Sequence, residues 1–195
     1  MRGPFENLVL VGFASTGKTA VGRVLAERLG FEFIDLDDRV ERLHVEERGE
    51  KRRCREIYSL FGRDCFVDYE TRALGELSGT GRAVIALGGG TPVVEVNRER
   101  ARELGCVVYL DASAEAIFER MKIKGFPLYL GDNPSLADLA VLVAERAPIY
   151  EQTADVIINN TALSPEAAAT AVITSVIVRG LLPEHLFPPS KEAVS

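Results

Sequence analysis

The segment GFASTGKT at residues 12–19 fits the pattern G-x-x-x-x-G-K-[ST], a loop that cradles phosphate groups between a strand and a helix. In such a loop several backbone N–H groups converge on one anion, and the helix N-terminus adds roughly half a positive charge. Lys18 can then reach the β- and γ-phosphates of a nucleoside triphosphate, and the Thr19 hydroxyl can ligate Mg²⁺. The segment predicts a nucleoside triphosphate site without distinguishing a kinase from a GTPase or a motor protein.

Carboxylates follow the next apolar run, in the segment FIDLDD at residues 33–38. Asp35 and Asp37 are two residues apart, so they point the same way if the chain there is extended. One can hold Mg²⁺ through water, and the other can accept a hydrogen bond from a substrate hydroxyl and take its proton. The alternative is that Asp37 or Asp38 only caps the following helix. Because the chain has no Asn-Lys-x-Asp guanine signature, these acids favour a small-molecule kinase.

Two further features are candidates for ligand contact. Gly88, Gly89 and Gly90 follow a third apolar run, and without Cβ atoms they let a ligand touch the backbone; a plain tight turn is the alternative. Arg146 begins the segment RAPIY at residues 146–150. It can contact an anion, or it can be a helix-end arginine that complements the helix dipole.

Short apolar runs alternate with helical patterns along the chain. Strands are expected at residues 8–11, 31–36, 83–87, 106–110 and 155–159. Helices are expected from Lys18 to a stop at Gly30, within 38–60 around a loop near Gly49, and at 66–78, 98–104, 113–121, 136–147 and 164–179. This alternation predicts a mainly parallel sheet whose strand carboxyl ends hold the ligand.

Composition sets outer bounds on function. The chain has 195 residues and a net charge of −6, with 47% hydrophobic residues, which is typical of one soluble domain. The charge argues against nucleic-acid binding, and no apolar stretch approaches the roughly 20 residues of a membrane span. The three cysteines fit neither a zinc nor a redox motif, so we expect a cytoplasmic protein with reduced thiols. We expect one domain over residues 1–182 and a disordered tail over 183–195.

Taken in order, the phosphate loop, the Asp-x-Asp, the triple glycine and the RAPIY segment resemble the shikimate kinase family over about residues 7–180. The resemblance implies a three-layer α/β P-loop kinase fold with a five-stranded parallel sheet in the order 2-3-1-4-5. It implies a substrate-binding segment at about 38–70 and a lid at about 121–134. It also implies transfer of the γ-phosphoryl group of ATP to the 3-hydroxyl of shikimate, on the pathway to aromatic amino acids. We expect Mg²⁺ as the cofactor and a monomeric protein.

The resemblance also implies roles for individual residues. Those that bind ATP are expected to be Ser15, Thr16, Gly17, Lys18, Thr19, Ala20 and, near the lid, Arg120. Mg²⁺ is assigned to Thr19 and, through its water shell, to Asp35. Substrate binding is assigned to Asp37, Gly88, Gly89, Gly90 and Arg146, with Arg146 on the carboxylate. Lys18 and Asp37 are the expected catalytic residues, with Asp37 as the base.

Three positions depart from the family pattern. Ser15 stands where the family usually has glycine, which is tolerable if its φ is below zero. Val67 and Phe126 stand where the family has a substrate-carboxylate arginine and a lid arginine, although the framework residues Phe66 and Glu70 are kept. We therefore expect an intact nucleotide half and an altered acceptor half, for which compensation can come from Arg63, Arg72, Lys122 or Lys124.

The departures leave alternatives open. Shikimate is the first expected acceptor, and another small hydroxylated substrate is the second. A regulatory module that binds nucleotide or ligand without catalysis is a third reading. A nucleoside monophosphate kinase fits the triple glycine and Arg146 less well.

Overall fold

The computed structural model describes residues 3–131 and 133–186. Its strands are β1 (Leu8–Val11), β2 (Glu32–Asp35), β3 (Ala83–Ala86), β4 (Cys106–Asp111) and β5 (Val156–Asn159). Its helices are α1 (Lys18–Leu29), α2 (Leu36–Arg48), α3 (Cys54–Gly75), α4 (Glu95–Leu104), α5 (Ala114–Lys124), α6 (Leu136–Thr153) and α7 (Pro165–Val178). Short 3-10 segments lie at η1 (Thr91–Val93), η2 (Leu128–Leu130) and η3 (Glu184–Leu186). All five predicted strands are confirmed, and each end lies within one residue of its predicted position.

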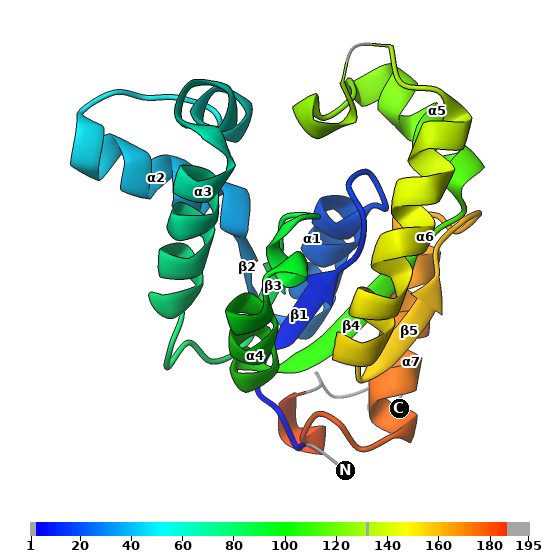
Figure 1. Cartoon of the computed structure of the whole chain (residues 1–195). Coiled ribbons are helices and arrows are strands. Elements are labelled where there is room, and N and C mark those ends of the chain that lie inside the picture. The colour runs from blue at the N-terminus through cyan, green and yellow to red at the C-terminus, as the bar shows by residue number, and fades with distance from the viewer. Residues whose placement is uncertain (1–2, 132, 187–195) are drawn as a thin grey trace.

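The strands form one parallel sheet in the order β2-β3-β1-β4-β5, which confirms the predicted order. On the central strand β1, Leu10 lies opposite Ala86 of β3 and Val108 of β4. Every residue of β1 and β3 is buried, as expected for strands covered by helices on both faces. Because the strands are parallel, their carboxyl ends meet at one edge of the sheet, toward the top of Figure 1.

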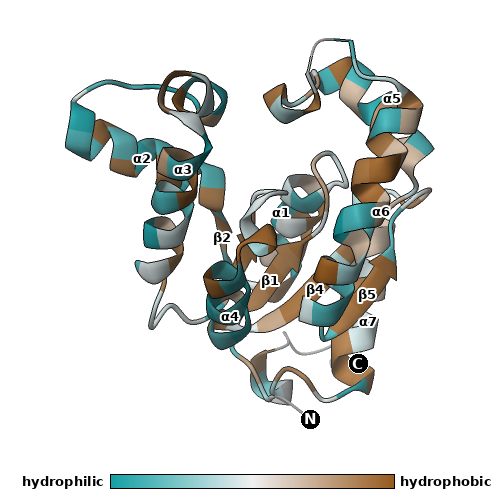
Figure 2. Ribbon diagram, in the orientation of Figure 1, coloured by the Kyte–Doolittle hydropathy of each residue, from teal (hydrophilic) through white to brown (hydrophobic). Residues whose placement is uncertain are grey.

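Two apolar layers hold the sheet between its helices. Leu8 and Leu10 point to one face of β1 and pack in a cluster with residues of α1 and α7. Val9 and Val11 point to the other face and pack with residues of α2 through α6. Figure 2 shows the strands in brown and much of α2 and α4 in teal, so hydropathy follows this layering. The result is the three-layer α/β architecture that was predicted.

Local capping explains several helix boundaries. Ser113 and Ser164 accept hydrogen bonds from the backbone N–H groups of Ala116 and Ala167, so both predicted caps are confirmed. α2 ends at Arg48 and is followed by Gly49, which confirms the predicted loop there. The helix predicted over residues 136–147 is longer than expected, because α6 continues through Pro148 to Thr153. The helix continues there with Tyr150 and Thr153 buried beneath it, so tertiary packing outweighs the proline.

The segment from the end of α7 to Leu186 is more ordered than predicted. Leu181, Leu182 and Leu186 are buried and pack in the same cluster as α1 and α7. The disorder expected from residue 183 is therefore wrong for η3, whose Leu186 is held by the apolar core. The rest of the predicted tail, residues 187–195, lies outside the described residues. Among the described helices, none has the length and apolarity needed to cross a membrane.

Candidate active site

The phosphate loop connects β1 to α1 at the strand carboxyl edge, so the predicted strand–loop–helix context is confirmed. Lys18 is buried, and its Nζ donates hydrogen bonds to the backbone oxygens of Gly12 (2.9 Å) and Phe13 (2.8 Å). Burial lowers the pKa of Lys18 to about 8, while the nearby charges of Asp37 and Asp35 raise it. The ammonium therefore lies across the loop that is predicted to receive the phosphates.

Two threonines of this loop have different surroundings. Thr16 is buried, and its hydroxyl donates to the backbone oxygen of Phe13 at 3.0 Å, so it supports the shape of the loop. Thr19 and Ala20 are exposed in the first turn of α1. The Thr19 hydroxyl is therefore accessible to a metal ion, as its predicted role requires.

Ser15 does not meet the condition under which serine is easily tolerated at this position. That condition is a φ below zero, whereas the φ of Ser15 is +63°, in the left-handed region. A left-handed residue with a Cβ costs roughly 1–2 kcal/mol relative to a relaxed conformation. The serine therefore adopts the backbone conformation that glycine takes more easily, and the loop keeps its shape at the expense of some strain.

Asp35 links the phosphate loop to α2. The Thr19 hydroxyl donates to Oδ2 of Asp35 at 3.0 Å, and Oδ1 of Asp35 accepts from the backbone N–H of Asp37 at 3.2 Å. The cap of α2 is thus Asp35, so the alternative that Asp37 or Asp38 is the cap is wrong. Asp37 lies in the first turn of α2, so the expectation of an extended chain through Asp37 is also wrong. A hydroxyl and a carboxylate this close form a pair of hard oxygen ligands that fits Mg²⁺.

Asp37 lies on the wall of a cavity of about 380 Å³ at the strand carboxyl edge. Its side chain is reached by solvent, yet its carboxyl is set among enough protein atoms that burial raises its pKa to about 6. The negative charge of Asp35 raises this pKa further, and the positive charge of Lys18 opposes the rise. Asp37 is therefore largely ionised at neutral pH, with a basicity well above that of an ordinary aspartate.

The cavity lies between helices from the two halves of the chain. In Figure 1, α2 and α3 stand to the left of the sheet and α5 and α6 to the right. Both groups contribute cavity walls, together with the loop after β3. The lining residues are Ala14, Asp37, Cys54, Arg55, Tyr58, Arg63, Phe66, Val67, Glu70, Gly88, Gly89, Gly90, Val93, Val94, Lys124, Gly125, Phe126, Pro127, Leu128, Tyr129 and Arg146.

The three glycines on the cavity wall have different surroundings. A Cβ at Gly89 would lie 2.8 Å from the backbone nitrogen of Ala14, so Gly89 packs tightly against the phosphate loop. A Cβ at Gly88 would lie 2.9 Å from Glu70 Oε1, whereas one at Gly90 would have no atom within 4 Å. Only Gly90 thus has open space beside it, while Gly88 and Gly89 are required by close packing within the protein.

Arg146 reaches the cavity from α6. It lies well inside that helix, so the reading of Arg146 as a helix-end arginine is wrong. Its guanidinium is 5.2 Å from the ring centroid of Phe13 and 4.8 Å from that of Tyr129. Among the described residues, its buried Nη1 has no hydrogen-bond partner. A buried cationic donor without a partner is costly, and an anionic ligand group in the cavity would satisfy it.

Arg120 lies beside the phosphate loop, as its predicted role requires. Its Nη2 donates to the backbone oxygens of Asn160 (2.9 Å) and Thr161 (3.0 Å), and its Nη1 to that of Thr16 (3.4 Å). The guanidinium therefore connects the phosphate loop to the segment that follows β5.

The acceptor half of the cavity contains groups that sequence reasoning did not single out. Arg55 lines the wall, but its sequence neighbourhood of mixed charges has no distinguishing signal. Glu70, named only as a framework residue, is 3% exposed and accepts a hydrogen bond from the Thr91 hydroxyl. Burial raises the pKa of Glu70 to about 7, and the charge of Asp37 contributes to the rise.

The four cations from which compensation was expected fall into two groups. Arg63 and Lys124 line the cavity, as do Val67 and Phe126. Arg72 instead forms ion pairs with Glu47 and Asp68, and Lys122 pairs with Glu119. None of the residues in these three ion pairs lines the cavity.

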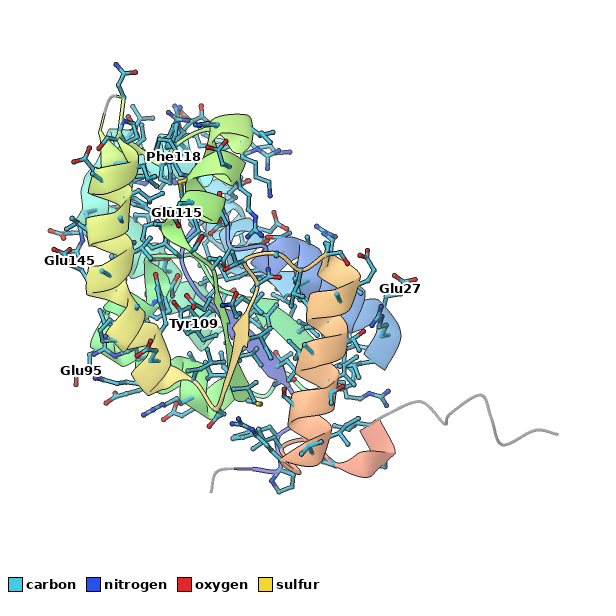
Figure 3. All side chains as sticks on the ribbon, turned by 90° about the vertical axis from the view of Figure 1, so that its right-hand side faces the viewer. Glu27, Glu95, Tyr109, Glu115, Phe118 and Glu145 are labelled. Carbon is cyan, nitrogen blue, oxygen red and sulfur yellow. The ribbon has the colours of Figure 1, made fainter. Side chains whose placement is uncertain are left out.

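The cavity charge differs in sign from the charge of the whole chain. Its lining includes four cations, Arg55, Arg63, Lys124 and Arg146, against two acids, Asp37 and Glu70. Figure 3 shows Glu27, Glu95 and Glu145 at the rim of the molecule, whereas Tyr109 lies inside. The net charge of −6 is thus carried on the outer surface, and the cavity can attract an anion.

A phosphate loop on the central strand of a parallel sheet in the order 2-3-1-4-5 is the arrangement of small-molecule P-loop kinases. The family model described as "Shikimate kinase" matches residues 14–177, so the chain belongs to the shikimate kinase family. Members of this family use ATP as co-substrate.

Curated relatives and solved structures agree with this assignment. The shikimate kinase of Thermodesulfovibrio yellowstonii is 37% identical over 86% of this chain and 93% of its own length. That of Geobacter sulfurreducens is 39% identical over 88% of this chain and 91% of its own length. The structure of Acinetobacter baumannii shikimate kinase in complex with shikimate aligns with a TM-score of 0.80 at 33% identity, covering 90% of this chain and 95% of that chain.

Proposed function

We propose that this protein acts as a monomeric cytoplasmic shikimate kinase that transfers the γ-phosphoryl group of ATP to the 3-hydroxyl of shikimate. The observation that carries this proposal is the cavity shared by Asp37 and Arg146. One group is a carboxylate with raised basicity, and the other is a guanidinium with an unpartnered, buried Nη1. A small molecule with a hydroxyl group and a carboxylate satisfies both.

On the nucleotide side, the loop N–H groups and Lys18 bind the β- and γ-phosphates. Thr19 and Asp35 would hold Mg²⁺, which would neutralise charge on the phosphate oxygens. The segment from Ser15 to Ala20 wraps the phosphates, and Arg120 orients the region where the nucleotide enters. The buried position of Lys18 keeps its charge directed at the phosphates and away from bulk solvent.

On the acceptor side, Asp37 accepts a hydrogen bond from the substrate hydroxyl and takes its proton as the phosphoryl group is transferred. In phosphoryl transfer the protein mainly positions the nucleophile and neutralises charge, so the placement of Asp37 near Lys18 is the central element. Arg146 binds the carboxylate, and the open face at Gly90 admits the ring.

Val67 and Phe126 support the second candidate, another small hydroxylated acceptor, because they add apolar surface to the cavity. The cations Arg55 and Arg63 favour an acceptor that is still anionic. A non-catalytic regulatory role is less well supported, because Lys18, Thr19, Asp35 and Asp37 are all present in the sequence.

ADP release with shikimate, quinate and a panel of neutral polyols separates these candidates. Asp37→Asn removes the base, and Asp38→Asn is the matched control, since Asp38 is an exposed neighbour outside the cavity lining. Turnover of shikimate that is lost in Asp37→Asn and kept in Asp38→Asn supports the proposal. Turnover of another acceptor alone supports the second candidate. Nucleotide binding without turnover of any acceptor supports the regulatory module.

A further inference from the structure

The cavity wall formed by α3 has a regular pattern that begins after a break in the helix. Gly62 has non-helical angles (φ 79°, ψ 175°), and the helix resumes at Arg63. From there the lining residues are Arg63, Phe66, Val67 and Glu70. Spacings of three and four residues place side chains on one helix face. Arg63 therefore lies on the same face as Val67, one turn closer to the break.

Arg63 is the cation of this helix segment that faces the cavity. Arg72, the other arginine after the break, is engaged by Glu47 and Asp68 outside the cavity. Arg55 precedes the break, and its Nη1 would lie 3.8 Å from a Cβ at Gly125, so it faces the connection after α5. Lys124 lies close enough to Lys18 to lower the pKa of that lysine, so it belongs to the phosphate side of the cavity.

The Arg63 guanidinium is available to a ligand. In the described part of the chain, no carboxylate forms an ion pair with it, unlike Arg42, Arg53 and Arg72. The positive charge of Arg63 opposes the rise in the pKa of Glu70. Because burial still holds the pKa of Glu70 at about 7, that carboxyl competes weakly with a fully ionised ligand for the guanidinium.

We propose that Arg63 is a specificity-determining residue that binds the carboxylate of the acceptor from the α3 wall, while Arg146 binds it from the α6 wall. The inference rests on the proposed function and adds a residue to it. A guanidinium offers two parallel N–H donors to a carboxylate, so two arginines on opposite walls select a carboxylated acceptor over a neutral polyol. Phe66 and Val67, next to Arg63 on the same face, contact the ring and cannot replace its charge.

The test compares Arg63→Met with the matched control Arg72→Met. For Arg63→Met, we expect the shikimate KM to rise roughly 10- to 100-fold, the range of one charge-assisted hydrogen bond, with kcat and the ATP KM within about 3-fold of wild type. Arg63→Lys restores part of the loss. Arg72→Met leaves the shikimate KM unchanged. Shikimate methyl ester, which lacks the negative charge, binds wild type and Arg63→Met equally weakly.

Calorimetric titration of shikimate onto the wild type and Arg63→Met separates this inference from the proposed function. If the wild type binds shikimate and Arg63→Met binds it roughly 10- to 100-fold more weakly, the role of Arg63 is supported even if turnover is slow. Wild-type turnover of shikimate with an unchanged KM in Arg63→Met overturns the role of Arg63 and leaves the proposed function standing. If the wild type neither binds nor phosphorylates shikimate, both are overturned.

Discussion

Asp37 and Glu70 both place a carboxyl group beside the same glycine, Gly88. A Cβ at Gly88 would lie 3.4 Å from Oδ1 of Asp37 and 2.9 Å from Oε1 of Glu70. The two acids come from α2 and α3, and the pKa of each is raised, to about 6 for Asp37 and about 7 for Glu70. In the pH range between these values, Asp37 is mostly ionised and Glu70 mostly protonated. Two neighbouring carboxyls thus have different protonation states at the reaction centre.

The first prediction concerns the pH dependence of the reaction. The base must be ionised to accept a proton, so kcat/KM for the acceptor falls as the pH falls through the pKa of Asp37, which is about 6. Below that value the loss is about tenfold per pH unit. Rates measured from pH 5 to pH 8 at subsaturating ATP and acceptor check this, because kcat/KM then reports ionisation in the free enzyme. An acid limb centred near pH 4, the ordinary range for aspartate, would contradict the raised pKa.

The second prediction concerns the stability contributed by Glu70. Its pKa is raised from 4.5 to about 7 in the folded protein, so ionisation is easier in the unfolded chain. The free energy of unfolding of the wild type therefore falls as the pH rises from about 4.5 through 7. Glu70→Gln has no carboxyl at this position, so it does not show this decrease. We expect the variant to gain on the order of 2 kcal/mol over wild type between pH 4.5 and 8.

Urea unfolding at both pH values measures this difference. Glu27→Gln is the control, because Glu27 is exposed on α1 and lies at the rim of the molecule (Figure 3). The same gain in Glu27→Gln, or none in Glu70→Gln, would show that the buried carboxyl is not its source.

The parts of the site that lie close together in the sequence were predictable. Lys18 and Thr19 follow their strand directly, so a local pattern and its flanking elements determine their position. Asp35 was also correctly placed at the end of its strand, since a short apolar run marks the strand. The sequence argument for Asp37 assumed an extended chain, which is wrong because α2 starts at Leu36 and not after the acids.

The parts that depend on packing were not predictable. The positive φ of Ser15 is imposed by the closure of the phosphate loop, and a serine at this position does not indicate it. The continuation of α6 past Pro148 is due to the buried side chains of Tyr150 and Thr153, two and five residues later. The choice of Arg63 over Arg72 depends on which face of α3 meets the cavity, which required the break at Gly62 to be located.

The third prediction concerns strain at Ser15. Ser15→Gly relieves the cost of the left-handed conformation but adds roughly 0.5–1 kcal/mol of unfolded-state entropy, so a small net stabilisation of about 0.5 kcal/mol is expected. Ser15→Val is expected to destabilise by at least about 1 kcal/mol, because a β-branched residue tolerates this conformation poorly. Thermal unfolding of both variants checks the order. A more stable Ser15→Val would mean that the residue has a negative φ.

The fourth prediction separates two neighbouring glycines. Gly89→Ala forces a Cβ to within 2.8 Å of the Ala14 nitrogen, so the phosphate loop must shift. We expect a loss of about 1–3 kcal/mol in stability and a raised KM for ATP. Gly90→Ala meets no atom within 4 Å and should leave the stability unchanged. Unfolding curves and ATP kinetics of the pair measure this, and equal destabilisation by both alanines would refute the close packing at Gly89.

The last prediction relocates a charge along α3. Positions 63 and 67 line the same cavity one helical turn apart, so an arginine at either can reach an acceptor carboxylate there. Val67→Arg placed in the Arg63→Met background should therefore return the shikimate KM to within about 3-fold of wild type. Asp68→Arg in the same background is the control, because Asp68 lies outside the cavity lining and pairs with Arg72. If only Val67→Arg restores the shikimate KM, the acceptor carboxylate binds a positive charge on this face of α3. If Asp68→Arg restores it as well, the effect is due to net charge.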